Sequence, residues 1–119
     1  IGTPDTLASR LVAASDDERR AALVAAALYG RADQLAVLIA AGAELDAYSP
    51  PGLHSHATAL HHAVDAGSLD AVIALVDAGA STEIRDRIYG GTALDWARHL
   101  GREAIGYWLE ERMGPGQGG

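Results

Sequence analysis

Cysteine, lysine, asparagine and phenylalanine are all absent from this chain of 119 residues. Without cysteine there are no disulfides, no thiolate metal ligands and no cysteine nucleophile. Cysteine usage therefore gives no information on the redox compartment of the protein. Alanine supplies 25 residues, and hydrophobic residues make up 49% of the chain. This composition predicts one globular domain of closely packed helices, and the bias towards Ala, Gly, Asp and Arg favours a bacterial, GC-rich genome.

Positive charge is scarce, because nine basic residues face 16 acidic ones and the formal net charge is −7 at pH 7. Such a chain repels phosphate backbones, since nonspecific nucleic-acid binding depends largely on Lys and Arg. The longest uncharged apolar stretch, residues 21–29, is about half of the roughly 20 residues that a membrane-spanning helix needs. The chain begins at Ile1 without a charged segment leading into an apolar one, so we expect no secretory signal. We expect a cytoplasmic protein that binds neither nucleic acid nor membranes.

Motifs that carry catalytic chemistry are missing too. The sequence contains no nucleophile elbow, no phosphate-binding glycine loop after a strand and no His-Glu-x-x-His helix. Serine, histidine and aspartate are present, but no spacing brings a nucleophile, a base and an orienting group together. The glycines of residues 114–119 are flanked by neither a strand nor a helix, so they are not a dinucleotide-binding motif, and we expect a disordered tail there. The protein is therefore predicted not to be an enzyme and to need no cofactor.

What the sequence does contain is an internal repeat of about 34 residues. The hexad TALHHA at residues 58–63 returns as TALDWA at 92–97, and a glycine follows each hexad at positions 67 and 101. Gly30 is a third equivalent, and the segments that lead from it to Gly42, and from Gly67 to Gly79, align without gaps. The repetition of motif, period and glycine positions together makes chance similarity a poor explanation.

Each repeat unit is predicted to contain two short helices followed by an extended hairpin. Thr58 and Thr92 suit the N-cap of the first helix, and Asp95 completes a capping box with Thr92. The glycine after each hexad suits the end of that helix. Residues 80–91 lack a helical period, which indicates the hairpin. The second helix carries one apolar face, made by Leu35, Leu38 and Ile39 in one unit and by Val72, Leu75 and Val76 in the next.

The two ends of the chain resemble caps on the stack. Residues 3–14 begin with a Thr-Pro-Asp sequence that suits a helix start, and they carry one apolar face. At the other end Ile105, Trp108 and Leu109 are expected to face inward, whereas residues 110–112 are charged where a further repeat would need apolar contacts. We therefore expect the stack to stop there.

The period and the motif resemble the ankyrin repeat family, whose units open with T-P-L-H-x-A. The resemblance covers roughly residues 20–113, although Ala59 and Ala93 stand where the family has Pro and Asp95 replaces the motif His. It implies an all-α repeat solenoid of helix-turn-helix units with β-hairpin fingers, in one domain over residues 1–113. We expect an N-terminal capping helix at 3–14 and three repeats at about 16–47, 48–86 and 87–113.

The resemblance also implies protein recognition through a concave face made by inner helices and fingers. We expect a monomer that binds another, unidentified protein. Arg85 and Arg87 are a positive exception on an acidic chain and suit an acidic segment of the partner. Tyr and Arg are enriched at interface hot spots. By register with the family pattern, the partner-facing residues are Tyr29, Tyr48, Asp65, Arg85, Arg87, Tyr89 and His99.

Four histidines within nine residues leave a second interpretation open. Imidazole is a common metal ligand, so His54, His56 and His62 are candidates for a small metal-responsive module that binds zinc or nickel. His61 holds the motif position, where the resemblance implies a structural side chain that supports a neighbouring hairpin. Simple exposure is favoured for His54 and His56, because two loop ligands fall short of a closed zinc site.

The two tryptophans and the chain as a whole each allow one further interpretation. Trp96 and Trp108 suggest a stacking platform for a ligand, but large aromatic side chains at helical spacing are more often part of the core, and we assign both to it. A structural spacer or self-associating unit is the third interpretation of the whole chain. It predicts a dimer whose population depends on concentration.

Overall fold

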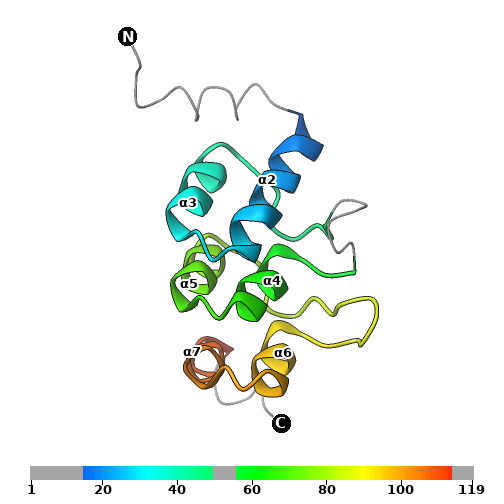
Figure 1. The fold of residues 1–119 in the computed structure, drawn as a ribbon, viewed down its shortest axis with the longest axis vertical. Coiled ribbons are helices and arrows are strands. Elements are labelled where there is room, and N and C mark those ends of the chain that lie inside the picture. Colours follow the sequence, from blue (N-terminus) through cyan, green and yellow to red (C-terminus); the bar gives the residue numbers. More distant parts are fainter. Residues whose placement is uncertain (1–14, 50–55, 114–119) are drawn as a thin grey trace.

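The computed structural model describes residues 15–49 and 56–113. The expected capping helix at 3–14, the tail at 114–119 and His54 lie outside the described residues. None of the described helices is long and apolar enough to cross a membrane. The described helices (Figure 1) are α2 (Asp16–Leu28), α3 (Ala32–Ala40), α4 (Ala59–Ala66), α5 (Leu69–Asp77), α6 (Ala93–His99) and α7 (Glu103–Met113).

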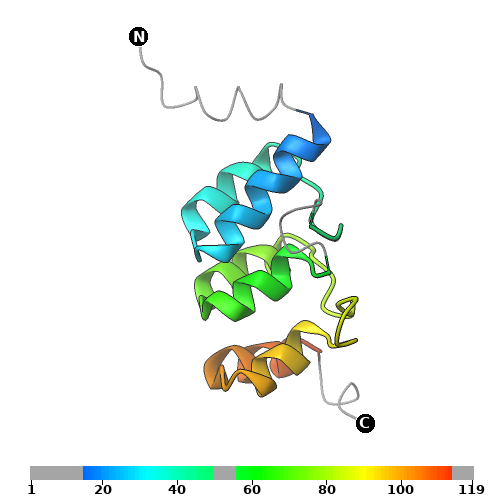
Figure 2. The same ribbon diagram turned by 45° about the vertical axis from the view of Figure 1, so that its right-hand side comes forward.

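Consecutive helices pair as helix-turn-helix units, α2 with α3, α4 with α5 and α6 with α7. The units stack so that α2, α4 and α6 form one layer and α3, α5 and α7 form a second layer beside it (Figures 1 and 2). We call α2, α4 and α6 the inner helices and α3, α5 and α7 the outer helices. The all-α repeat architecture predicted from the sequence period is confirmed.

Capping boxes set where two of the inner helices begin. The Ser15 Oγ accepts the Glu18 N–H at 3.1 Å, and the Ser15 N–H donates to Glu18 Oε1 at 2.9 Å. Thr92 and Asp95 form the predicted box at the start of α6, with corresponding distances of 3.2 and 3.0 Å. Each box satisfies backbone N–H groups that the first helical turn leaves without a helical partner.

The turn between α2 and α3 requires glycine at position 30. Gly30 has a φ of 65°, which places it in the left-handed region. A Cβ at this position would lie 3.0 Å from the Cβ of Ser68, the residue that caps α5. A side chain here would therefore strain the turn and push the first unit away from the second.

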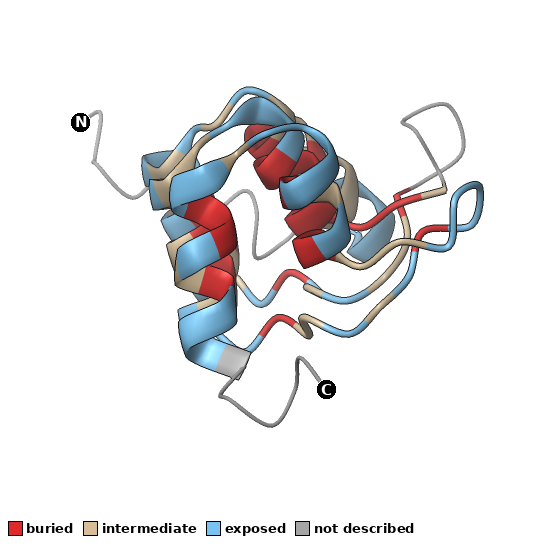
Figure 3. Ribbon diagram, turned by 90° about the horizontal axis from the view of Figure 1, so that it is seen from below, coloured by how far each residue is buried: buried red, intermediate tan, exposed pale blue. Residues whose placement is uncertain are grey.

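The core lies between the two helical layers, where the buried segments of the helices face one another (Figure 3). In the predicted apolar face of the outer helices, Leu35, Val72 and Leu75 are fully inaccessible to solvent, and the other members are buried or partly buried. Alanines such as Ala27 and Ala63 are equally buried, which lets neighbouring helices approach closely. The expectation of closely packed helices is confirmed.

The last described helix of the stack is α7. Ile105 and Leu109 are buried, and Trp108 packs against the core while remaining partly accessible. The Arg112 guanidinium lies 4.6 Å from the centre of the Trp108 ring and also pairs with Asp77 of α5. Residues 110–112 are exposed, as their charge leads one to expect.

Two loops project from the edge at which α4 and α6 begin (Figures 1 and 2). We call the described residues of the first loop, 43–49 and 56–58, the first finger and residues 80–92 the second finger. The sequence predicted β-hairpins, but pairing among the described residues is limited to one isolated antiparallel bridge between Tyr48 and Thr58. Side-chain hydrogen bonds supplement the backbone hydrogen bonds within and between the described parts of the fingers.

Candidate protein-binding surface

The second finger is folded around the carboxylate of Asp86, whose side chain is fully buried. Its Oδ1 accepts the backbone N–H groups of Ile88 at 2.9 Å and Tyr89 at 2.6 Å. Its Oδ2 accepts the Gly91 N–H at 2.9 Å and the indole N–H of Trp96 at 2.8 Å. One side chain thus ties the tip of the finger to the inner helix α6.

These hydrogen bonds keep Asp86 ionised. Burial raises the pKa of the carboxyl group, but the bonds from Tyr89, Trp96, Gly91 and Ile88 together hold that pKa well below its ordinary value. The His56 ring lies beside the same carboxylate, with Nδ1 3.9 Å from Oδ1. The finger is therefore built on a permanent buried negative charge at neutral pH.

His61 links the start of α4 to the second finger. Its Nδ1 accepts the Thr58 N–H at 3.2 Å, so the proton of the neutral ring belongs on Nε2, which lies 2.9 Å from the Gly91 carbonyl oxygen. Burial lowers the pKa of His61 and favours this neutral form. The interpretation of His61 as a structural residue is confirmed, and the element that it supports is the second finger.

The two fingers are also bound to each other. The Tyr48 hydroxyl donates to the Arg85 carbonyl oxygen at 2.7 Å, and the Arg87 guanidinium lies 3.8 Å from the centre of the Tyr48 ring. The Arg87 N–H donates to the His56 carbonyl oxygen at 2.7 Å, and Arg85 Nη1 donates to the Gly90 carbonyl oxygen at 2.8 Å. The finger arginines are therefore held in place by contacts within this chain.

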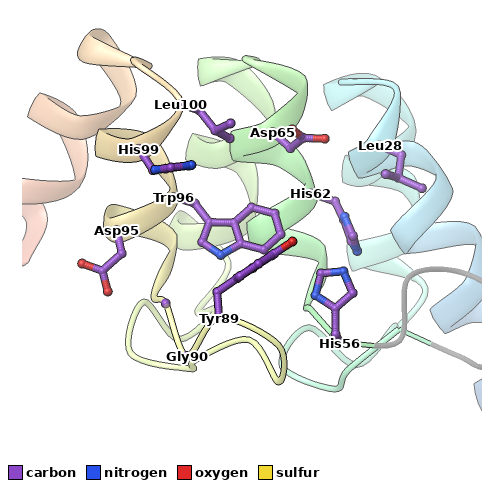
Figure 4. A pocket seen from close by; sticks show the side chains of 11 residues that line it. Leu28, His56, His62, Asp65, Tyr89, Gly90, Asp95, Trp96, His99 and Leu100 are labelled. Atoms are coloured by element: carbon purple, nitrogen blue, oxygen red, sulfur yellow. The ribbon is translucent and has the colours of Figure 1, made fainter.

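A pocket of about 650 Å³ lies on the exposed face of the inner helices beside the second finger. In Figure 4 Trp96 occupies its middle, finger residues line one end and residues from the C-terminal ends of the inner helices line the other. The volume is in the range of pockets that bind small-molecule ligands. This inner pocket is lined by Leu28, His56, His62, Asp65, Tyr89, Gly90, Gly91, Asp95, Trp96, His99 and Leu100.

The residues expected to face a partner are divided by the structure. Asp65, Tyr89 and His99 line the inner pocket. Tyr29 is highly exposed but lines a separate hollow between α2 and α3. Three expected residues lie on the fingers and do not line the pocket: Tyr48, Arg85 and Arg87. The two arginines form hydrogen bonds with residues that line it, and Tyr48 contacts both arginines.

The sequence did not identify Trp96 and His62 as part of this surface. Trp96 was assigned to the core, and the structure shows it partly buried with one side open to the pocket. A signal was present, because His62 and Trp96 both occupy the fifth position of their hexads. In the same way Leu28, Asp65 and His99 each stand two residues before the repeat glycine. Equivalent repeat positions thus form one surface.

The described residues contain no group of three or more His, Cys, Asp or Glu side chains placed to hold a metal ion. The rings of His56 and His62 lie 6.4 Å apart, measured between their centres. The third candidate ligand, His54, lies outside the described residues. The metal-responsive interpretation therefore remains a prediction.

Comparison with known proteins agrees with the repeat found in the sequence. Residues 23–114 match the family model described as ankyrin repeats, in three copies. No curated protein sequence matches the chain.

Proposed function

This chain belongs to the ankyrin repeat family, and we propose that it binds a protein partner through its inner helices and fingers. Ankyrin repeats are generally protein–protein interaction modules and are typically not catalytic. The observation that carries the proposal is the inner pocket, in which aromatic and acidic side chains gather beside a firmly held finger.

The second finger presents apolar side chains to solvent on a fixed backbone. Tyr89 is 79% exposed and Ile88 is 63% exposed, yet the backbone N–H groups of both are bound by the buried Asp86 carboxylate. Apolar side chains that gather in one exposed patch often mark a site of interaction. A preorganised backbone lowers the entropic cost of binding. This combination favours a partner-binding role for the finger tip.

The finger arginines extend the proposed surface beyond the pocket. Arg85 keeps 67% of its side chain accessible, although it lies 4.0 Å from Asp95. Arg87 stacks on Tyr48, so its position is fixed while the other face of the guanidinium points away from the ring. We propose that both contact acidic groups of the partner, and that Tyr29 contributes a separate contact at the end of α2.

The rest of the proposal follows the same family membership. The protein acts as a monomeric binding module without a cofactor or catalytic activity, in the cytoplasm. Its partner is another protein rather than nucleic acid, since acidic residues outnumber basic ones.

Two tyrosines provide a matched test. Peptides selected from a displayed random library against the parent protein are measured with Tyr89→Ala and with Tyr107→Ala. Both side chains are largely exposed, but Tyr107 lies on α7 outside the pocket. We expect Tyr89→Ala to weaken binding by about tenfold or more and Tyr107→Ala to leave it unchanged, with little effect of either on the melting temperature. Equal binding by parent and Tyr89→Ala would contradict the proposal.

A further inference from the structure

The inner pocket has an electrostatic character that the finger arginines do not share. Neither Arg nor Lys is among the described residues that line it, whereas Asp65 and Asp95 do line it. Asp95 is engaged in the cap of α6 and lies 4.0 Å from Arg85. Asp65 forms no ion pair with any described residue, so its charge remains available.

Helix ends add to this negative potential. Leu28 is the last residue of α2, Asp65 lies in the last turn of α4 and His99 is the last residue of α6. The C-terminal end of a helix carries a partial negative charge from its carbonyl groups. Three such ends therefore lie in a row along the end of the pocket farthest from the fingers (Figure 4).

Asp65 occupies a position that helix stability alone disfavours. A carboxylate in the last turn is repelled by the negative end of the helix. Arg102 of this chain binds the C-terminal end of α4, since its Nη2 donates to the Asp65 carbonyl oxygen at 2.6 Å. Arg102 does not line the pocket, and Asp65 keeps its carboxylate exposed beside it. The end of α4 thus already binds one guanidinium group and leaves a carboxylate for another cation.

The middle of the pocket suits the apolar stem of a long cationic side chain. Trp96 and Tyr89 offer aromatic surface, and aromatic faces attract Arg and Lys. The Trp96 indole N–H is bound at 2.8 Å by the ionised Asp86, which places a further negative charge next to the ring. Leu28 and Leu100 add apolar surface near Asp65.

We propose that the inner pocket binds an Arg or Lys side chain of the partner, with the stem along Trp96 and Tyr89 and the charged head at Asp65. This inference rests on the proposed function, because it assigns a chemical class to what the same surface binds. The finger arginines lie outside the pocket, so a different residue of the partner meets them.

The test uses the two tryptophan indole N–H signals of the 15N-labelled protein. Trp96 reports on the pocket, and Trp108 on α7 is the internal reference. The probes are acetylated and amidated pentapeptides, Gly-Gly-X-Gly-Gly, in which X is Arg, Lys, Leu or Glu, at millimolar concentration. We expect the Arg or Lys peptide to shift the Trp96 signal with an affinity about tenfold higher than the Leu peptide, and added salt to weaken that binding.

Variants separate the charge of the pocket from the charge of the protein. We expect Asp65→Asn to remove most of the preference for the Arg and Lys peptides over the Leu peptide. Glu111→Gln also replaces a carboxylate by its amide, at an exposed site on α7, and should retain that preference. Asp65→Asn should also melt no lower than the parent, because it removes a charge that the helix end disfavours. A binding loss in Asp65→Asn that accompanies unfolding would contradict this assignment.

The remaining outcomes distinguish this inference from the function on which it rests. No Trp96 shift with the Arg and Lys peptides, or equal affinity for the Leu peptide, overturns the cation preference. Binding of the Leu or Glu peptide at Trp96 as tightly as the Arg and Lys peptides, or more tightly, would leave the pocket as a protein-binding site and remove only that preference. Shifts confined to the outer helices would overturn both.

Discussion

The helical layers and the fingers differ in the kind of side chain that each buries. Between the layers the buried side chains are apolar, as at Leu35 and Leu75. At the fingers and the first turn of α4, the described structure buries polar groups as well: Ser49, Thr58, His61, His62 and Asp86. Apolar packing depends on volume, whereas buried hydrogen bonds depend on matched donors, acceptors and protonation states. The two regions should therefore fail under different perturbations.

Loss of volume should damage the layers most. Leu75→Ala removes a fully buried side chain from α5, which packs against α3, α4 and α7. We expect a loss of about 2 to 5 kcal/mol in the free energy of unfolding, measured by urea denaturation. Ile88→Ala deletes a similar volume from the exposed finger tip and should cost less than about 0.5 kcal/mol. An unchanged urea midpoint for Leu75→Ala would show that the core is assigned wrongly.

A change of hydrogen-bonding chemistry should damage the fingers at nearly constant volume. Asp86→Asn places an NH₂ group opposite N–H donors and should cost about 1 to 3 kcal/mol. The same substitution at exposed Asp65 should cost nothing. Urea denaturation of both variants checks this, and equal stability of Asp86→Asn and the parent would mean that the carboxylate does not organise the finger.

Acid should also act on the fingers before it acts on the layers. The pKa of His61 is lowered in the fold, so below about pH 6.5 the unfolded chain binds the proton first and stability falls. The contribution of Asp86, whose pKa is also lowered, is present above about pH 4 and is lost only below it.

As the pH falls from 6.5 towards the lowered pKa of His61, this residue should reduce the free energy of unfolding by up to about 1.4 kcal/mol per pH unit. Unfolding free energies of the parent and of His61→Gln at about pH 7.5 and 5.5 measure it. His61→Gln should be less stable than the parent at neutral pH, but its free energy of unfolding should change less between these two pH values. If the free energy of unfolding changed equally in both proteins, groups other than His61 would be responsible for the pH dependence.

The smallest predicted effect is a gain within the layers. Gly106 lies inside α7, and a Cβ there would make an ordinary contact, 3.9 Å from the Cβ of Ala97. Gly106→Ala should therefore stabilise the fold by about 0.5 to 1 kcal/mol, seen as a higher urea midpoint. Gly30→Ala is the contrasting variant and should destabilise, because Gly30 has a positive φ. A lower midpoint for Gly106→Ala would indicate closer packing of α6 and α7.

The layers were largely predictable from the sequence, since short-range patterns specify them. The hexads and glycines located the helices, and the spacing of Leu35 and Leu38 identified the buried face, which the structure confirms. The box of Thr92 and Asp95 required only residues three apart.

The inner pocket was less predictable, because it depends on groups that the fold brings together. Nothing in the segment around Asp86 indicates that its carboxylate binds the indole ten residues away. The stacking of Arg87 on Tyr48 joins two different fingers. Only the repeat register carried a usable signal, since Asp65 and His99 hold equivalent positions and both line the pocket.

The location of the binding surface can be measured directly by following backbone amide signals while a library-selected peptide is added to the 15N-labelled protein. The proposed function predicts that the largest shifts fall on residues of the inner pocket and the second finger, with Asp65, Tyr89 and Trp96 among them. Shifts confined to the outer helices α3, α5 and α7 would contradict it.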